Sequence, residues 1–147
     1  MAKAGRRSRV PVGVSDLLVL DAEGVSKAAT NNRSVQAWLE RARELDADVV
    51  ISAATVAEVV RGVGRDADCE RVIKSADVWP VDEALARQAG RLLGRTRSQA
   101  TIDAFVAVTA VTARQHNGSA RCVVLTSDPH DLAMLLSDEP GISVIRV

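Results

Sequence analysis

The chain has 147 residues, the size of a single domain, which is long enough to bury a hydrophobic core. Hydrophobic residues make up 47% of it and charged residues 26%, which is typical of a globular protein and excludes a disordered one. The formal net charge is zero, but four bases precede the first acid, Asp16; removing them from the 19 Lys and Arg leaves 15 bases against 19 acids. The body of the chain therefore lacks the broad basic surface of a generic DNA-binding protein.

Residues 1–13 carry those four bases and are expected to form a disordered basic tail, with one domain over residues 14–147. Apolar runs and helical spacing alternate along that domain. Five short apolar runs are predicted strands: 17–20, 48–53, 78–81, 122–125 and 142–147. Six segments are predicted helices: 34–45, where apolar residues recur at helical spacing, 55–63, the polar segment 66–76, 82–93, 102–115 and 129–136. Such alternation predicts a mainly parallel sheet flanked by helices, an α/β fold in three layers.

Other residue types exclude several kinds of protein. The only aromatic residues are Trp38, Trp79 and Phe105, which disfavours a nucleic-acid binder that stacks bases on aromatic platforms. The two cysteines, Cys69 and Cys122, are expected to be small buried hydrophobes in a reducing cytosol, and two histidines argue against a zinc site. No run approaches the roughly 20 apolar residues of a membrane helix, so we expect a cytoplasmic protein without membrane contact.

Four acids lie where the carboxyl ends of parallel strands would meet. Asp21 follows the first predicted strand, Glu58 lies in the helix after the second, Asp103 opens a long helix and Asp128 follows the fourth strand. Two unit charges at 4 Å repel by roughly 1 to 4 kcal/mol near a protein surface, so a fold would not gather these carboxylates without compensation. Mg²⁺ binds through a few carboxylates and keeps waters for phosphate substrates. A divalent cation at this edge would supply the compensation.

Each acid also has a structural interpretation. Thr55 and Glu58 match a capping box, Asp103 opposes a helix dipole, and Asp128 before a proline is a suitable N-cap. Asp21 is the exception, because it caps no predicted helix.

Four motifs together resemble the PIN-domain family, especially its VapC-type toxins. They are the Asp that closes the first strand, A-E-V-V-R-G, I-D-A-F-V-A and T-S-D-P-H-D-L, in that order. The resemblance runs from about Leu17 to Val147. It implies a PIN-like fold and a Mg²⁺- or Mn²⁺-dependent endoribonuclease, usually a homodimer, held inactive by a cognate antitoxin.

The resemblance also assigns residues. Asp21, Glu58, Asp103 and Asp128 match the acidic quartet of the family, with one or two cations among them, and Thr126 matches its supporting hydroxyl. Asp131 falls where some members carry a further acid. A metal-activated water would then hydrolyse RNA phosphodiesters, leaving a 5′-phosphate and a 3′-hydroxyl. Glu23 is a departure, since many members have a small or hydroxyl residue there; it is a ligand, an outer-sphere contact or a solvated side chain.

Several arginines are candidates for RNA or partner contact. Arg87, Arg91 and Arg95 recur every four residues along one helix face, with Arg97 just beyond, and either contact phosphates or form a solvated stripe. Arg61 lies one helical turn from Glu58 and faces either RNA or an antitoxin.

Two other phosphate-handling classes fit poorly. A response-regulator receiver needs a late lysine, and the only lysines are Lys3, Lys27 and Lys74. A haloacid-dehalogenase-like phosphatase needs a different second acid after Asp21 and the same late lysine. Two alternatives stay open: a catalytically silent PIN scaffold that binds or regulates a partner, and a PIN-like DNA nuclease.

Overall fold

The computed structural model describes residues 16–147, so the predicted tail and the domain boundary at residue 14 lie outside the described residues. Five strands form one sheet: β1 (Asp16–Leu20), β2 (Asp48–Ser52), β3 (Asp77–Trp79), β4 (Arg121–Thr126) and β5 (Ile142–Arg146). The helices are α2 (Ala22–Ala29), α3 (Arg33–Glu44), α4 (Ala53–Val59), α5 (Asp66–Ser75), α6 (Glu83–Thr96), α7 (Thr101–Asn117) and α8 (Pro129–Leu135). All five predicted strands and all six predicted helices are present, with shifted ends.

The sheet has the strand order β3-β2-β1-β4-β5, and every pair of neighbouring strands is parallel. The predicted α/β fold is therefore confirmed. The chain first adds β2 and β3 on one side of β1 and then β4 and β5 on the other side. The order reverses between β1 and β4, and in sheets of this kind ligands bind at the carboxyl ends of the strands beside such a reversal.

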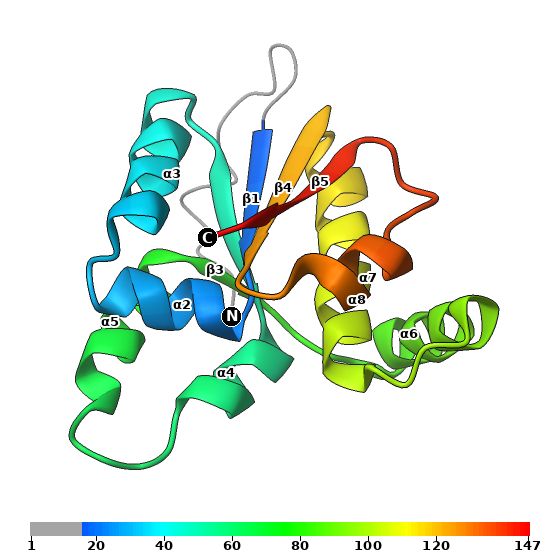
Figure 1. The fold of residues 1–147 in the computed structure, drawn as a ribbon, viewed down its shortest axis with the longest axis horizontal. Helices are drawn as coiled ribbons and strands as arrows, with labels where there is room; N and C mark the ends of the chain where they lie inside the picture. The colour runs from blue at the N-terminus through cyan, green and yellow to red at the C-terminus, as the bar shows by residue number, and fades with distance from the viewer. Residues whose placement is uncertain (1–15) are drawn as a thin grey trace.

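Alternate residues of the central strand belong to two separate cores. Leu17 and Val19 pack with α6, α7 and α8, whereas Leu18 and Leu20 pack with α2, α3 and α5. Figure 1 shows these two groups of helices on opposite faces of the sheet. β1 is buried on both faces, as its unbroken apolar run requires.

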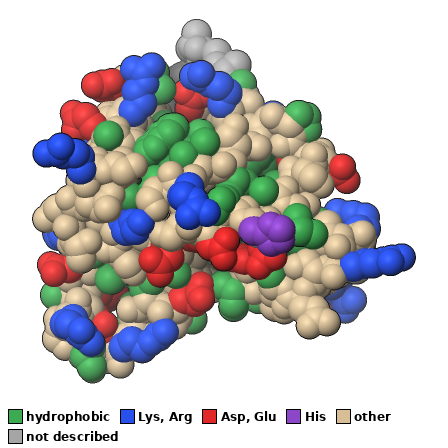
Figure 2. Space-filling model, in the orientation of Figure 1, with side chains coloured by type: hydrophobic (Ala, Val, Ile, Leu, Met, Phe, Trp, Pro, Cys, Tyr) green, Lys and Arg blue, Asp and Glu red, His purple; other side chains and the backbone are tan. Residues whose placement is uncertain are grey.

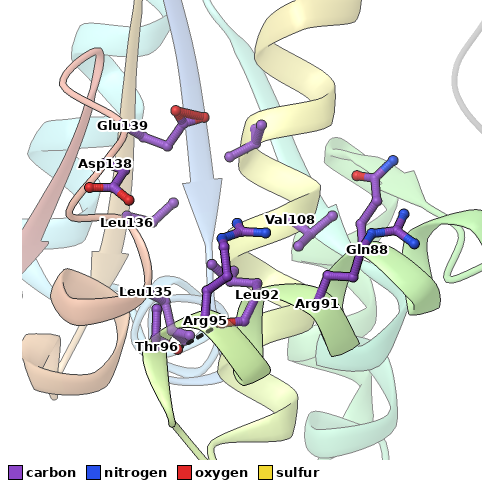
Figure 3. A pocket seen from close by; sticks show the side chains of 11 residues that line it. Gln88, Arg91, Leu92, Arg95, Thr96, Val108, Leu135, Leu136, Asp138 and Glu139 are labelled. Atoms are coloured by element: carbon purple, nitrogen blue, oxygen red, sulfur yellow. Dashed lines mark hydrogen bonds between the residues drawn. The ribbon is translucent and has the colours of Figure 1, made fainter.

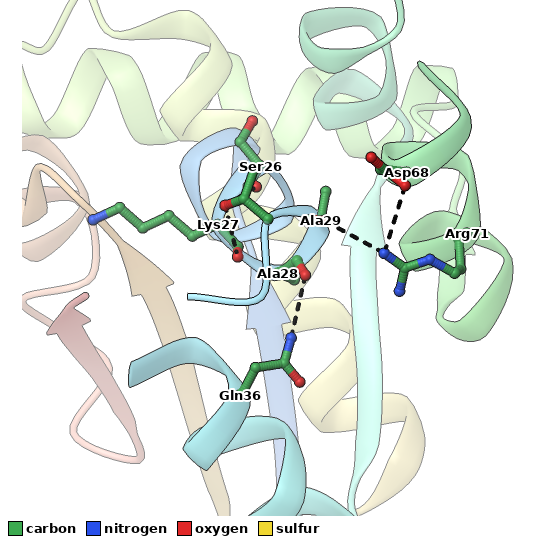
Figure 4. Close-up of polar contacts among 8 residues, drawn as sticks. Ser26, Lys27, Ala28, Ala29, Gln36, Asp68 and Arg71 are labelled. Carbon is green, nitrogen blue, oxygen red and sulfur yellow. Dashed lines mark hydrogen bonds and ion pairs between the residues drawn. The ribbon is translucent and has the colours of Figure 1, made fainter. Parts of the chain in front are cut away.

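The helix α2 was not predicted. It follows β1 without a linker, because Asp21 ends the strand and caps the helix. Side chains from other elements hold it in place (Figure 4): Gln36 donates to the Ala28 carbonyl at 3.2 Å, and Arg71 donates to the Ala29 carbonyl at 3.4 Å. Lys27 donates to the Val147 carbonyl at 2.6 Å. The last turn of α2 is thus tied to α3, to α5 and, through Lys27, to the residue that follows β5.

The cysteines differ from each other. Cys122 is buried in β4, where burial raises the pKa of its thiol to about 12, as expected of a small hydrophobe. Cys69 is only half-buried. Among the described residues, no helix combines the length and apolar character needed to cross a membrane.

Gly24 is the point at which α2 approaches the sheet most closely. A Cβ at this position would lie 3.2 Å from the Leu125 carbonyl oxygen and 3.3 Å from Leu20 Cβ, both in buried strands. Gly90, on the exposed side of α6, has nothing within 4 Å of such an atom. The two glycines form a matched pair.

We expect Gly24→Val to lower the free energy of unfolding by about 1–3 kcal/mol through overpacking. Gly90→Ala should raise it by about 0.5–1 kcal/mol, because alanine is the better helix former. Urea unfolding followed by circular dichroism measures both. A Gly24→Val protein as stable as the wild type would show that α2 does not rest tightly on the sheet.

Candidate functional site

Asp21 lies at the centre of the carboxyl edge and is largely buried, at 8% exposed. It is the N-cap of α2: its Oδ1 accepts a hydrogen bond from the Gly24 N–H at 2.8 Å. The expectation that Asp21 caps no helix is therefore wrong, and the cause is the unpredicted helix α2. Burial raises the pKa of the Asp21 carboxyl, while hydrogen bonds from Thr126 and from backbone N–H groups oppose the rise.

Thr126 joins the ends of β1 and β4. Its buried hydroxyl accepts the Asp128 backbone N–H at 3.1 Å, donates to the Asp128 carbonyl at 3.3 Å, and lies beside the Asp21 carboxyl, whose pKa it lowers. One side chain thereby orients the acid after β1 and fixes the turn that carries the acid after β4.

Asp103 is the most perturbed acid of the site. It lies half-buried in the first turn of α7, which crosses beneath β1, β2 and β4. Its pKa rises from 3.8 to about 6 through burial and through the negative charges, in decreasing order, of Asp131, Asp21, Glu58 and Asp128. The structure thus brings four carboxylates within electrostatic range of Asp103, and Asp131 acts on it more strongly than the matched quartet members do.

Glu58 completes the site from the exposed side of α4. The N-cap of α4 is Ser52, whose Oγ accepts the Ala54 N–H at 3.2 Å, so the capping box of Thr55 and Glu58 is not formed. Thr55 is instead buried. Partial burial and the charges of Asp21 and Glu23 raise the pKa of Glu58, and the Arg61 guanidinium opposes them.

Glu23 and Arg61 both lie at the rim of this group. Glu23 is exposed in the first turn of α2, and its charge also raises the pKa of Asp21. Arg61 is exposed and donates from Nη1 to the Ala57 and Val60 carbonyls. Arg61 therefore places a positive charge beside the acidic group on the α4 side.

Asp128 and Asp131 belong to α8. Asp128 is the N-cap, accepting the His130 N–H on Oδ1 at 3.4 Å, with Pro129 in the first turn, as the capping interpretation expects. Asp131 is half-buried in the same turn. Figure 2 shows acidic side chains gathered in the middle of this face, beside a histidine.

The arginines of α6 do not share one environment. Arg87 is paired with Glu83 at 2.7 Å, and Arg97 ends the helix with a left-handed backbone, φ 56°. Arg91 and Arg95 line a pocket of 240 Å³ between α6, α7 and the turn after α8, which Asp138 and Glu139 also line (Figure 3). The predicted stripe is thus divided, and phosphate contact by Arg91 and Arg95 stays a prediction.

The donor set fits a hard divalent cation in kind. Carboxylate oxygens are the ligands that Mg²⁺ and Mn²⁺ prefer. A bound cation would also offset the repulsion between Asp103 and the neighbouring carboxylates. Within residues 16–147, no three His, Cys, Asp or Glu side chains are already grouped so as to hold a metal ion. A bound cation would therefore need its carboxylate ligands closer together than they lie in this arrangement.

The fold and the acidic edge define an α/β domain of the PIN type. The PIN domain family model matches residues 19–133, and the chain belongs to this family. Among curated proteins no sequence is significantly similar.

Three solved structures with the same fold come from toxin–antitoxin systems. VapBC2 from Rickettsia felis, bound to a DNA fragment from its promoter, matches with a TM-score of 0.66 at 12% identity, over 89% of this chain and 98% of that one. A toxin–antitoxin complex from Klebsiella pneumoniae matches with a TM-score of 0.64 at 16% identity, over 88% and 99%. VapBC-1 from nontypeable Haemophilus influenzae gives 0.62 at 16%, over 88% and 97%. At these identities the likeness establishes the fold.

Two residues that the sequence analysis did not assign to the site lie at its border. His130 on α8 and Arg146 on β5 line the same hollow as Asp128. The alternation of side chains along β5 could have indicated Arg146, because Ile142, Val144 and Arg146 point to one face of the sheet.

The raised pKa of Asp103 predicts how stability depends on pH. Because the folded-state pKa exceeds the unfolded value, the ionised carboxylate destabilises the fold above about pH 6, and the penalty disappears below pH 4. In EDTA, Asp103→Asn should be more stable than the wild type at pH 7 by on the order of 1–2 kcal/mol, and equally stable at pH 4.

Urea unfolding at both pH values tests this. Asp68→Asn, which removes an exposed acid of α5, is the matched control and should show no such dependence. If Asp103 serves only to oppose the helix dipole, Asp103→Asn will instead lose about 0.3–1 kcal/mol at pH 7.

Proposed function

We propose that this protein is a metal-dependent endoribonuclease, a VapC-like toxin, and that Asp21, Glu58, Asp103 and Asp128 form its catalytic site. The observation that carries the proposal is the group of carboxylates around Asp103, whose pKa is raised to about 6 by its burial and by the charges of those neighbours. Membership of the PIN family and the likeness to toxin–antitoxin structures support the nuclease assignment.

The quartet, with Asp131, would hold one or two Mg²⁺ or Mn²⁺ ions. When bound, such an ion lowers the pKa of a water and neutralises charge on the phosphodiester. Asp21 and Thr126 are the fixed part of the site, because Asp21 is buried, caps α2 and is hydrogen-bonded by Thr126. Glu58 and Asp128 are exposed and adjust to the substrate. Arg61 lies where it can contact an RNA phosphate that enters beside Glu58.

A protein partner is part of the proposal. Two of the similar structures are of VapBC proteins and a third is of a toxin–antitoxin complex, which supports a cognate antitoxin for this chain. A groove of 600 Å³ with Trp38, Leu45 and Ile145 in its wall lies between α3 and β4–β5 and offers apolar surface for such a partner. Figure 2 shows hydrophobic side chains open to solvent there. A cytoplasmic homodimer remains the expected form.

The test of the proposal is RNA cleavage by the purified protein with Mn²⁺, compared with EDTA. We expect Mn²⁺-dependent cleavage that Asp21→Asn reduces by at least two orders of magnitude and Asp68→Asn leaves unchanged. Fragments should end in a 5′-phosphate and a 3′-hydroxyl. Fragments ending in a 2′,3′-cyclic phosphate would contradict the mechanism, because they require attack by the ribose. Cleavage of single-stranded DNA but not RNA would favour the PIN-like DNA nuclease.

Cation binding is tested separately from cleavage. Mn²⁺ should raise the melting temperature of the wild type and of Asp68→Asn, but not of Asp103→Asn, since the cation relieves repulsion that the variant lacks. Differential scanning calorimetry with and without Mn²⁺ measures the shift. An equal effect of Mn²⁺ on all three proteins, with no cleavage, would favour the catalytically silent scaffold.

A further inference from the structure

A hollow of 510 Å³ opens directly beside the acidic site, between the outer face of α8 and the end of β5. Asp128 belongs to both the hollow and the acidic group. Pro129, His130 and Met134 line it from α8, and Arg146 lines it from β5. A strand of RNA whose phosphate lies at the carboxylates would place a neighbouring nucleotide in this hollow.

Its lining suits a nucleobase better than another ion. His130 offers an imidazole plane, and Met134, at 45% exposed, offers a polarisable thioether that packs against ring edges. Bases stack on histidine rings and on arginine guanidinium planes as well as on larger aromatics. The hollow therefore supplies stacking surface in a chain that has only three Trp, Tyr and Phe residues.

The pairing of β4 with β5 places Arg146 beside the hollow, where its guanidinium can contact a base. Arg146 is paired with Thr126, the residue that orients Asp21, so it stands at the carboxyl edge of β5. Ile142 and Val144 on the same strand pack in the core with α8, so the alternation directs Arg146 to the α8 side. It is exposed there, one strand away from the proposed catalytic acids.

We infer that this hollow is a nucleotide-binding subsite, in which His130 and Met134 hold the base next to the scissile phosphate and Arg146 contacts the base or its phosphate. The subsite rests on the proposed function, since it takes RNA as the polymer that reaches Asp128. It gives the enzyme a means of selecting the nucleotide beside the cleavage point.

The composition supplies a direct probe of this inference. Met1 and Met134 are the only methionines, so ¹³C-methyl labelling gives two signals, which Met134→Leu assigns. Titration of the metal-free full chain with adenosine, guanosine, cytidine and uridine 5′-monophosphates should move the Met134 methyl signal upfield and saturably for at least one of them. Ribose 5-phosphate, which has no base, should not move it.

Variants test the named contacts. His130→Ala and Arg146→Gln should each weaken that nucleotide's binding roughly fivefold or more, the loss expected for one stacking partner. The matched controls are His116→Ala, the other histidine, which packs on Trp79, and Arg33→Gln at the start of α3. Both controls should bind as the wild type does. Circular dichroism confirms that each variant is folded.

Three results would overturn the subsite: no Met134 shift with any nucleotide, an equal shift with ribose 5-phosphate, or equal losses in the control variants. The first would leave the hollow to a protein segment, and the second would make it an anion site. In the nuclease assay, His130→Ala should raise KM with kcat unchanged, because the base is held equally in the ground and transition states. The methyl titration needs neither metal nor cleavage, so failure of the nuclease and failure of the subsite are distinguishable.

Discussion

Several carboxylates lie at one edge of the parallel sheet, and the local structure has to accommodate the repulsion between them. Each pair of carboxylates at 4 Å costs roughly 1–4 kcal/mol, and the charges of four others act on Asp103. The chain offsets part of this repulsion with hydrogen bonds to two of the acids. Asp21 and Asp128 each accept a backbone N–H as the N-cap of a helix, which is worth about 1 kcal/mol per cap. The neighbouring Thr126 hydroxyl further favours the ionised form of Asp21.

Capping and cation binding are therefore compatible roles for the same residues. An ionised carboxylate has two oxygens with about four acceptor positions, and a cap uses one of them. For the buried Asp21, the cap fixes the direction of the side chain while leaving acceptor capacity for a cation. Asp103 has no such partner: it opens α7 without acting as its cap, and its pKa rises to about 6. The acid with the least local compensation is the one on which a cation would have the greatest effect.

The sequence predicts the sheet well, because a strand buried on both faces requires an unbroken apolar run such as Leu17–Leu20. It predicts which acids follow strands, and hence which ones share an edge, for the same reason. It does not reveal α2, because the residues after Asp21 include Gly24 and Ser26 and the helix depends on contacts from Gln36 and Arg71. Nor does it separate Arg91 and Arg95 from Arg87, since their spacing is the same and only the ion pair with Glu83 differs. The effect of the Asp131 charge on the pKa of Asp103 likewise depends on the packing of α8 against α7. No short sequence motif predicts that packing.

The helix α8 has one face buried in the core and one face exposed. Leu132 and Leu135 are buried in the core shared with α6 and α7, which fixes the position of Asp128 and Asp131 at the edge of the sheet. The opposite face carries His130 and Met134, which support no core packing. Substitutions on that outer face can change what lies beside the acids without moving the acids themselves. Under the proposed function, a few exposed residues of α8 and the last strand can therefore set which nucleotide is accepted while the hydrolytic centre stays the same.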